Sequence, residues 1–177
     1  MVIEAAQLVG LEVAGEQGKK LGSVETLVFN GQTTRLAGFG VNRPGLLTKT
    51  VGLPFEETLL LGPDKITVNS EAALGQSTKT LDELFKKYGR VIGVTAKTES
   101  GRRIGKIADV FIEAETGLIV RFYLRNALKE QIIPRQFLVA LTPQQVVFKD
   151  VVDQPIFDQV ATLEVAPTEK SLALSNE

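Results

Sequence analysis

The chain has 177 residues, of which 44% are hydrophobic and 23% are charged, values typical of a globular protein with a packed core. Its formal net charge of -1 offers no field that would attract phosphate backbones, so direct binding of DNA is not expected. The chain contains no histidine and no cysteine, which excludes Ser-His-Asp and Cys-His catalysis and metal sites built from these side chains.

The amino-terminal segment, Met1 to Gln7, does not have the pattern of a signal peptide, because it carries Glu4 and no long apolar run follows it. No stretch of the chain approaches the roughly 20 apolar residues that a membrane-spanning helix needs. We therefore expect a protein that is not transmembrane and that resides in the cytoplasm, either free or at the periphery of a membrane complex. A very short helix is expected at Ala5 to Leu8.

Apolar residues in the first half of the chain recur with a spacing of two, the period that places side chains on one face of a β-strand. This spacing predicts strands over Val24–Phe29 and Leu36–Val41, joined at Asn30-Gly31, a dipeptide typical of hairpin turns. Leu59–Leu61 and Ile66–Val68 are expected to form a further hairpin around a turn that begins with proline.

A short helix is predicted between the two halves, after the polar stretch from Ser70 to Thr78. Thr80 and Glu83 have the spacing of a capping box, and Gly89 suits the position that ends a helix. Apolar residues recur between them with the period of one helix face: Leu81, Leu84, Phe85 and Tyr88. We expect this helix to cover the core of the second half, with binding of a partner as the alternative.

The second half of the chain repeats the pattern of the first. Gly18 and Gly22 correspond to Gly101 and Gly105, 83 positions later, with apolar residues matching at the positions that follow. After a gap of three residues, Leu53-Pro54 corresponds to Ile133-Pro134, 80 positions later. The repeat predicts strands at Ile107–Ile112 and Ile119–Leu124, a turn at Thr116-Gly117, and a hairpin of Val139–Leu141 with Val146–Phe148.

These patterns predict an all-β protein with two small barrel-like units in tandem and a short helix between them. The expected boundaries are residues 1–70 for the first unit, 71–90 for the linker with its helix, 91–165 for the second unit and 166–177 for a mobile tail. Units of this size are near the lower limit for burying enough apolar surface alone, so the two are expected to pack against each other.

Each half resembles the PRC-barrel domain, a small β-barrel whose pattern is Gly-x-x-apolar-Gly-x-apolar, a strand, a turn that contains glycine, and a second strand. The first half matches this pattern at Gly18–Phe29 and Leu36–Val41, and the second half matches it at Gly101–Ile112 and Ile119–Leu124. The first half departs from it at the turn, where Thr34 stands in place of a glycine. The matching positions specify a fold and no catalytic group.

The resemblance implies a binding role. In the PRC-barrel family the domain occurs in the cytoplasmic part of the H subunit of the photosynthetic reaction centre and in a ribosome maturation factor, where it engages other proteins. We therefore expect a non-enzymatic protein-binding adaptor or assembly module without a cofactor, with the photosynthetic apparatus as one candidate assembly. The expected partners are proteins, such as a membrane-bound complex approached from its cytoplasmic side, or a second copy of the chain in a homo-oligomer. The alternative is an accessory factor of ribosome maturation or RNA processing that binds a ribosomal protein.

Carboxylates and glycine-rich segments are the remaining candidates for chemistry. Glu113 and Glu115 are expected to share a strand face near Asp109, an arrangement that we interpret as a solvated strand edge rather than a cation site. The segment from Gly101 to Lys106 lacks the spacing and the following helix of a phosphate-binding loop, and Gly38 to Gly40 lacks the helix of a dinucleotide site. No catalytic, cofactor-binding or metal-binding residue is predicted.

Basic residues cluster at the two corresponding glycine turns. Because such groups can dock on an acidic protein surface or on anionic lipid headgroups, they are the candidate partner-docking residues, with a merely solvated face as the alternative. They are Lys19 and Lys20 in the first half, and Arg102, Arg103 and Lys106 in the second.

Overall fold

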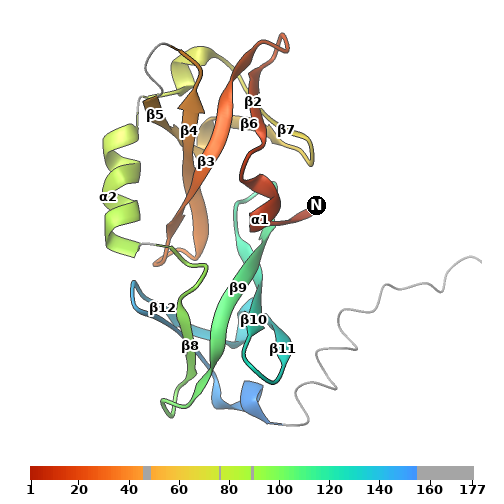
Figure 1. The fold of residues 1–177 in the computed structure, drawn as a ribbon, viewed down its shortest axis with the longest axis vertical. Helices are drawn as coiled ribbons and strands as arrows, with labels where there is room; N and C mark the ends of the chain where they lie inside the picture. Colours follow the sequence, from red (N-terminus) through yellow and green to blue (C-terminus); the bar gives the residue numbers. More distant parts are fainter. Residues whose placement is uncertain (46–48, 76, 89, 155–177) are drawn as a thin grey trace, which may run out of the picture.

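The computed structural model describes residues 1–45, 49–75, 77–88 and 90–154, which form two β-sheets with few helices (Figure 1). The first sheet has the order β5-β4-β3-β2-β7-β6. Its strands are β2 (Glu12–Gly15), β3 (Lys20–Asn30), β4 (Arg35–Arg43), β5 (Lys49–Pro54), β6 (Thr58–Leu61) and β7 (Lys65–Val68), with the 3-10 turns η1 (Phe55–Glu57) and η2 (Glu71–Ala73).

The second sheet has the same order at the corresponding positions, β11-β10-β9-β8-β13-β12. Its strands are β8 (Thr95–Thr98), β9 (Arg103–Glu113), β10 (Ile119–Arg125), β11 (Glu130–Pro134), β12 (Leu138–Leu141) and β13 (Gln145–Phe148), with the 3-10 turns η3 (Arg135–Phe137) and η4 (Asp150–Asp153). Each sheet contains one parallel pair at equivalent residues, since Val13 pairs with Ile66 and Ala96 with Val146. The all-β prediction is thus confirmed.

Glycines lie in the connections where the sequence predicted turns. Gly18 and Gly101 have φ angles of 80° and 86°, in the left-handed region that glycine adopts without strain. Thr34 and Gly117, which are aligned in the two halves, also share this conformation, with φ angles of 56° and 70°. The first half therefore has a different residue at this position, Thr34 instead of glycine, but the turn has the same backbone conformation.

The helix between the two halves, α2 (Thr78–Tyr88), packs on β3, β4 and β5 of the first sheet. The expectation that it covers the second core is wrong. The capping box at Thr80 is also wrong, because the helix begins two residues earlier and the hydroxyl of Thr78 accepts a hydrogen bond from the Gly52 N–H at 2.8 Å. Gly89 lies outside the described residues.

The start of the chain belongs to the other half. Strand β1 (Val2–Glu4), which the sequence did not predict, pairs antiparallel with β9 of the second sheet, and Ile3 is opposite Ile112. The predicted short helix is present as α1 (Ala5–Leu8), and it packs on β9 and on β3. The start of the chain thus packs on the second half, and α2, which comes just before the second half, packs on the first. We call this arrangement of the two units the interlock (Figure 1).

The two sheets also meet through backbone hydrogen bonds and a shared core. The Leu36 N–H donates to the Gly117 carbonyl at 2.8 Å, and the Ile119 N–H donates to the Thr34 carbonyl at 3.0 Å. These bonds join the turn after β3 to the turn after β9. Buried side chains of both sheets form one continuous hydrophobic cluster, as the small size of each unit led us to expect. Its fully buried members include Phe39, Leu53, Phe122 and Phe148.

Candidate binding surfaces

The basic turns of the two halves lie at opposite ends of the molecule. The connection between β2 and β3 is at one end of the long axis and the connection between β8 and β9 is at the other, because the far ends of β3 and β9 meet at the junction (Figure 1). One 11-residue strand spans roughly 35 Å. The five predicted docking residues therefore form two separate groups and no single patch.

Ion pairs within the chain already involve three of these five residues. Lys19 contacts Glu71 at 3.0 Å and Lys20 contacts Glu12 at 3.5 Å. Arg102 forms an ion pair with Asp153. Arg103 and Lys106 are exposed, and neither has an acidic partner within 4.0 Å in the part of the chain that the structure describes.

Glu71 gathers the basic residues at the first end. Its carboxylate contacts Lys19 and also forms an ion pair with Arg43. The hydrogen bond and charge of Lys19, followed by those of Arg43, hold the pKa of Glu71 below its ordinary value. Since all three groups are solvated, this network orders the surface more than it stabilises the fold. Lys19 is therefore committed to a structural contact.

The carboxylates of the second half do not form a common strand face. Glu113 ends β9 and accepts a hydrogen bond from the Thr116 hydroxyl at 2.6 Å, whereas Glu115 lies in the following turn and pairs with the amino terminus at 3.3 Å. The prediction of a shared face for Glu113 and Glu115 is wrong because the strand ends between them. Among the described residues, no group of three or more acidic side chains could hold a metal ion.

Asp109 anchors the amino-terminal arm, which we define as β1 and α1. Its buried carboxylate accepts hydrogen bonds from the Ala6 N–H at 3.2 Å and from the Val110 N–H at 2.8 Å. Burial raises the pKa of Asp109, the two backbone donors oppose this shift, and the nearby charge of Glu4 adds to it. The sequence repeat did not predict this contact, because the first half has Thr26 at the position that corresponds to Asp109.

The Asp109 contact predicts different effects for two substitutions. Asp109→Ala removes the acceptor of the Ala6 N–H and is expected to cost on the order of 1 kcal/mol, with faster hydrogen exchange in residues 2–8. Asp109→Asn keeps an acceptor without the charge, so the arm should stay protected. Because the folded-state pKa of Asp109 is raised, the wild-type loses stability as the pH rises above the usual value of 3.8.

The measurement is thermal unfolding between pH 3 and pH 8 with amide exchange at neutral pH. Asp109→Asn should lack the part of this pH dependence that Asp109 causes. Equal exchange rates of the arm in Asp109→Ala and in the wild-type protein would contradict the anchoring role.

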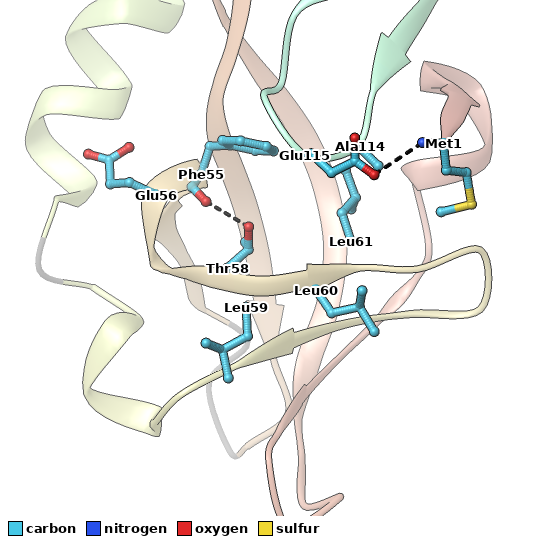
Figure 2. Close-up of a pocket in the computed structure, with 9 residues that line it drawn as sticks. All are labelled: Met1, Phe55, Glu56, Thr58, Leu59, Leu60, Leu61, Ala114 and Glu115. Atoms are coloured by element: carbon cyan, nitrogen blue, oxygen red, sulfur yellow. Dashed lines mark hydrogen bonds and ion pairs between the residues drawn. The ribbon is translucent and has the colours of Figure 1, made fainter.

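A shallow pocket lies where the two units meet (Figure 2). Its volume is about 240 Å³, and its lining includes Phe55 and Leu61 from the first unit, and Met1 and Glu115 from the other side of the junction. Leu59 and Leu60 project from the opposite side of β6, as Figure 2 shows, and both are about half exposed. The lining mixes apolar side chains with Glu56, Thr58 and Glu115, and the Thr58 hydroxyl donates to the Phe55 carbonyl at 2.7 Å.

A second hollow of about 620 Å³ lies between α2 and the turn after β9. It is lined by apolar and hydroxyl side chains, with Arg35 and two glutamates as its only ionisable groups among the described residues. The Arg35 guanidinium donates to the Thr116 carbonyl at 3.3 Å and thereby links the two halves across this hollow. Arg35 therefore contributes to the junction between the units.

Comparison with known proteins adds a family match to these observations. No helix among the described residues is long and apolar enough to cross a membrane. No curated protein matches the chain. The sequence model of the PRC-barrel domain matches residues 1–74, a segment that contains every strand of the first sheet. The resemblance of the first half of the sequence to the PRC-barrel domain is therefore confirmed over residues 1–74.

Proposed function

We propose that the chain is a non-enzymatic, protein-binding adaptor in which a second PRC-barrel-like unit, predicted over residues 91–165, follows the first. The repeat of glycine and apolar positions supports this assignment of the second unit, as does the equal strand order of the two sheets. PRC-barrel domains are generally binding modules, and the matched segment extends over the first unit. The chain would then offer two related surfaces to a larger assembly.

The observation that carries this proposal is the interlocked junction. The arm of the first half is part of the second sheet, α2 covers the first sheet, and one core joins both. Two units held in this way keep a constant relative geometry. A rigid pair loses little conformational entropy when it binds, which is the physical advantage of a scaffold over two domains on a flexible linker.

Arg103 and Lys106 are the docking residues that the structure favours among the five basic candidates. Both belong to β9 and are exposed, without an acidic partner in the described part of the chain. Lys19, Lys20 and Arg102 would first have to release Glu71, Glu12 and Asp153. An acidic protein surface would therefore gain more from contact with β9 than with the opposite end of the molecule.

Charge reversal at the two ends tests this assignment. Arg103→Glu with Lys106→Glu is expected to weaken capture of the partner from native extract about tenfold and to reduce its salt dependence. Lys19→Glu with Lys20→Glu is the matched control and should change capture little. Crosslinking followed by mass spectrometry identifies the partner. Recovery of no partner by the wild-type chain would contradict the adaptor function, and an equal loss in both variants would contradict the choice of β9.

Fractionation of the same extract distinguishes the two settings that the family suggests. Co-purification with a membrane complex at its cytoplasmic face supports an assembly such as the photosynthetic apparatus. Salt-sensitive sedimentation with ribosomal subunits supports the maturation role. Co-purification with membranes together with absence from ribosomal fractions at low salt would rule out the ribosomal alternative.

A further inference from the structure

The outer faces of the two sheets differ at equivalent positions. On the first sheet this face lies under α2, and its cross-strand rows consist of small residues. The rows are Val28, Gly38 and Pro54; Thr26, Gly40 and Gly52; and Ser23, Asn42 and Thr50. A Cβ atom added at Gly38 or at Gly52 would lie 3.0 Å from the Leu81 side chain of α2. The small residues are therefore what lets the helix approach the sheet.

The same rows of the second sheet carry large side chains. They are Phe111, Arg121 and Pro134; Asp109, Tyr123 and Ile132; and Lys106, Arg125 and Glu130. We define the outer face as the six residues Lys106, Phe111, Arg121, Tyr123, Arg125 and Ile132. Within the described ranges, α1 packs on β9, and no α-helix lies along β10 and β11 as α2 lies along the first sheet. The equivalent face thus has a different composition and no equivalent cover.

The residues of the outer face are arranged for contact with another molecule. Phe111, Arg121, Tyr123 and Ile132 are partly exposed and are not part of the hydrophobic core. The Arg125 guanidinium lies 5.6 Å from the Tyr123 ring centre and 2.8 Å from Glu130, so this arginine is held in place. Tyrosine, phenylalanine and arginine are among the residues enriched at protein interfaces, and tyrosine and arginine are also enriched at their energetic centres.

Basic and acidic side chains both lie on the outer face, and they differ in the contacts that they make. Asp109 is engaged with the arm, and Glu130 is engaged with Arg125. Lys106 and Arg121 have no acidic partner within 4.0 Å among the described residues, and Glu4 lies across β9 at the margin of the face. An incoming surface therefore gains most if it places carboxylates over β10 and an apolar stripe over Phe111, Tyr123 and Ile132.

We propose that the outer face of the second sheet is the docking surface for an amphipathic helix of a partner protein, with acidic side chains beside its apolar stripe. This rests on the proposed adaptor function and names the partner's structure. On the first sheet α2 lies across the equivalent rows, where the residues are small. A helix on the second sheet would lie farther from its strands and would contact the large side chains of the outer face. Three adjacent strands span about 10 Å, which matches the diameter of one helix.

The test uses the full-length chain and a displayed library of helical peptides, with leucine on one face and randomised polar positions elsewhere. Selection is expected to enrich acidic residues beside the leucine stripe, and the selected peptide should shift amide resonances of β9, β10 and β11. Arg121→Glu should weaken binding of the peptide about tenfold, whereas Arg90→Glu, at an exposed arginine outside the sheet, is the matched control and should not.

Three results would overturn the helix-docking proposal. These are failure of any helical peptide to be enriched, resonance shifts that map to α2 or to the pocket lined by Phe55 and Leu61, and equal binding by Arg121→Glu and wild-type. If the wild-type chain still captures a partner in any of these cases, and capture still depends on Arg103 and Lys106, the adaptor function stands. Only the proposal that the partner binds through a helix is then rejected. Circular dichroism of each variant verifies that the fold is kept.

Discussion

Replacing Phe122 with alanine is expected to lower the free energy of unfolding by about 3–5 kcal/mol. Phe122 is fully buried in the second sheet, and its ring meets that of Phe148 edge to face at a centroid distance of 5.2 Å and an angle of 77°. The substitution removes this aromatic contact and leaves a cavity in the core beside β10. Strand β10 lies between β9 and β11 in the second sheet. Urea denaturation followed by circular dichroism measures the loss.

The shape of the unfolding transition is as informative as its midpoint. Because buried residues of both units form one cluster, we expect a single transition in which both sheets unfold together. Leu59→Ala is the control, since Leu59 is about half exposed and its loss should cost about 0.5 kcal/mol or less. A loss of less than about 1 kcal/mol for Phe122→Ala would contradict the placement of this ring in the core.

Replacing Gly52 with valine is expected to displace α2 from the first sheet and to cost about 2–3 kcal/mol. A Cβ atom at Gly52 would lie 2.7 Å from the Thr78 Cα and 3.0 Å from the Leu81 side chain. The clash falls on helix backbone, which cannot turn aside as a flexible side chain would. The same movement lengthens the hydrogen bond from the Gly52 N–H to the Thr78 hydroxyl.

Thermal unfolding and amide exchange in α2 measure this displacement. Gly45→Val is the matched control, because an added Cβ at Gly45 meets no heavy atom within 4 Å. The expected result is faster exchange throughout Thr78–Tyr88 in the Gly52 variant and wild-type exchange in the control. If both variants keep the helix fully protected, α2 does not rest on this part of the sheet.

Local features of the fold were predictable from the sequence. Alternating apolar residues located β3, β4, β9 and β10 to within a few residues, since a buried sheet face requires that period. Glycines at 18 and 101 located turns because their φ angles are positive.

Long-range pairing was not predictable from the same patterns. The residue pattern of Val2–Glu4 does not indicate that this segment pairs with β9, more than a hundred residues away. The residue pattern of α2 likewise does not indicate which of the two sheets the helix covers. The start of α2 was misplaced for a related reason, because the Thr78 hydroxyl bonds to a distant strand rather than within a local capping box.

The candidate docking residues show the same limit. The repeat aligns the basic turns of both halves and so suggested one kind of site, but alignment in sequence carries no information about distance in space. The far ends of β3 and β9 meet at the junction, which sends the two turns to opposite ends (Figure 1). Ion pairing further separates Arg103 and Lys106 from Lys19, Lys20 and Arg102.

The rigid pairing of the two units depends most on the interlock, in which strand β1 of the arm belongs to the second sheet. Since the chain contains no cysteine, a pair of engineered cysteines tests this without background. Val2 lies opposite Glu113 in the β1–β9 ladder, and Asn30 is the equivalent of Glu113 in the first half. Mild oxidation of Val2→Cys with Glu113→Cys is expected to form an intramolecular disulfide in the monomer, whereas Val2→Cys with Asn30→Cys stays reduced. Rapid bridging to position 30 with none to position 113 would contradict the interlock.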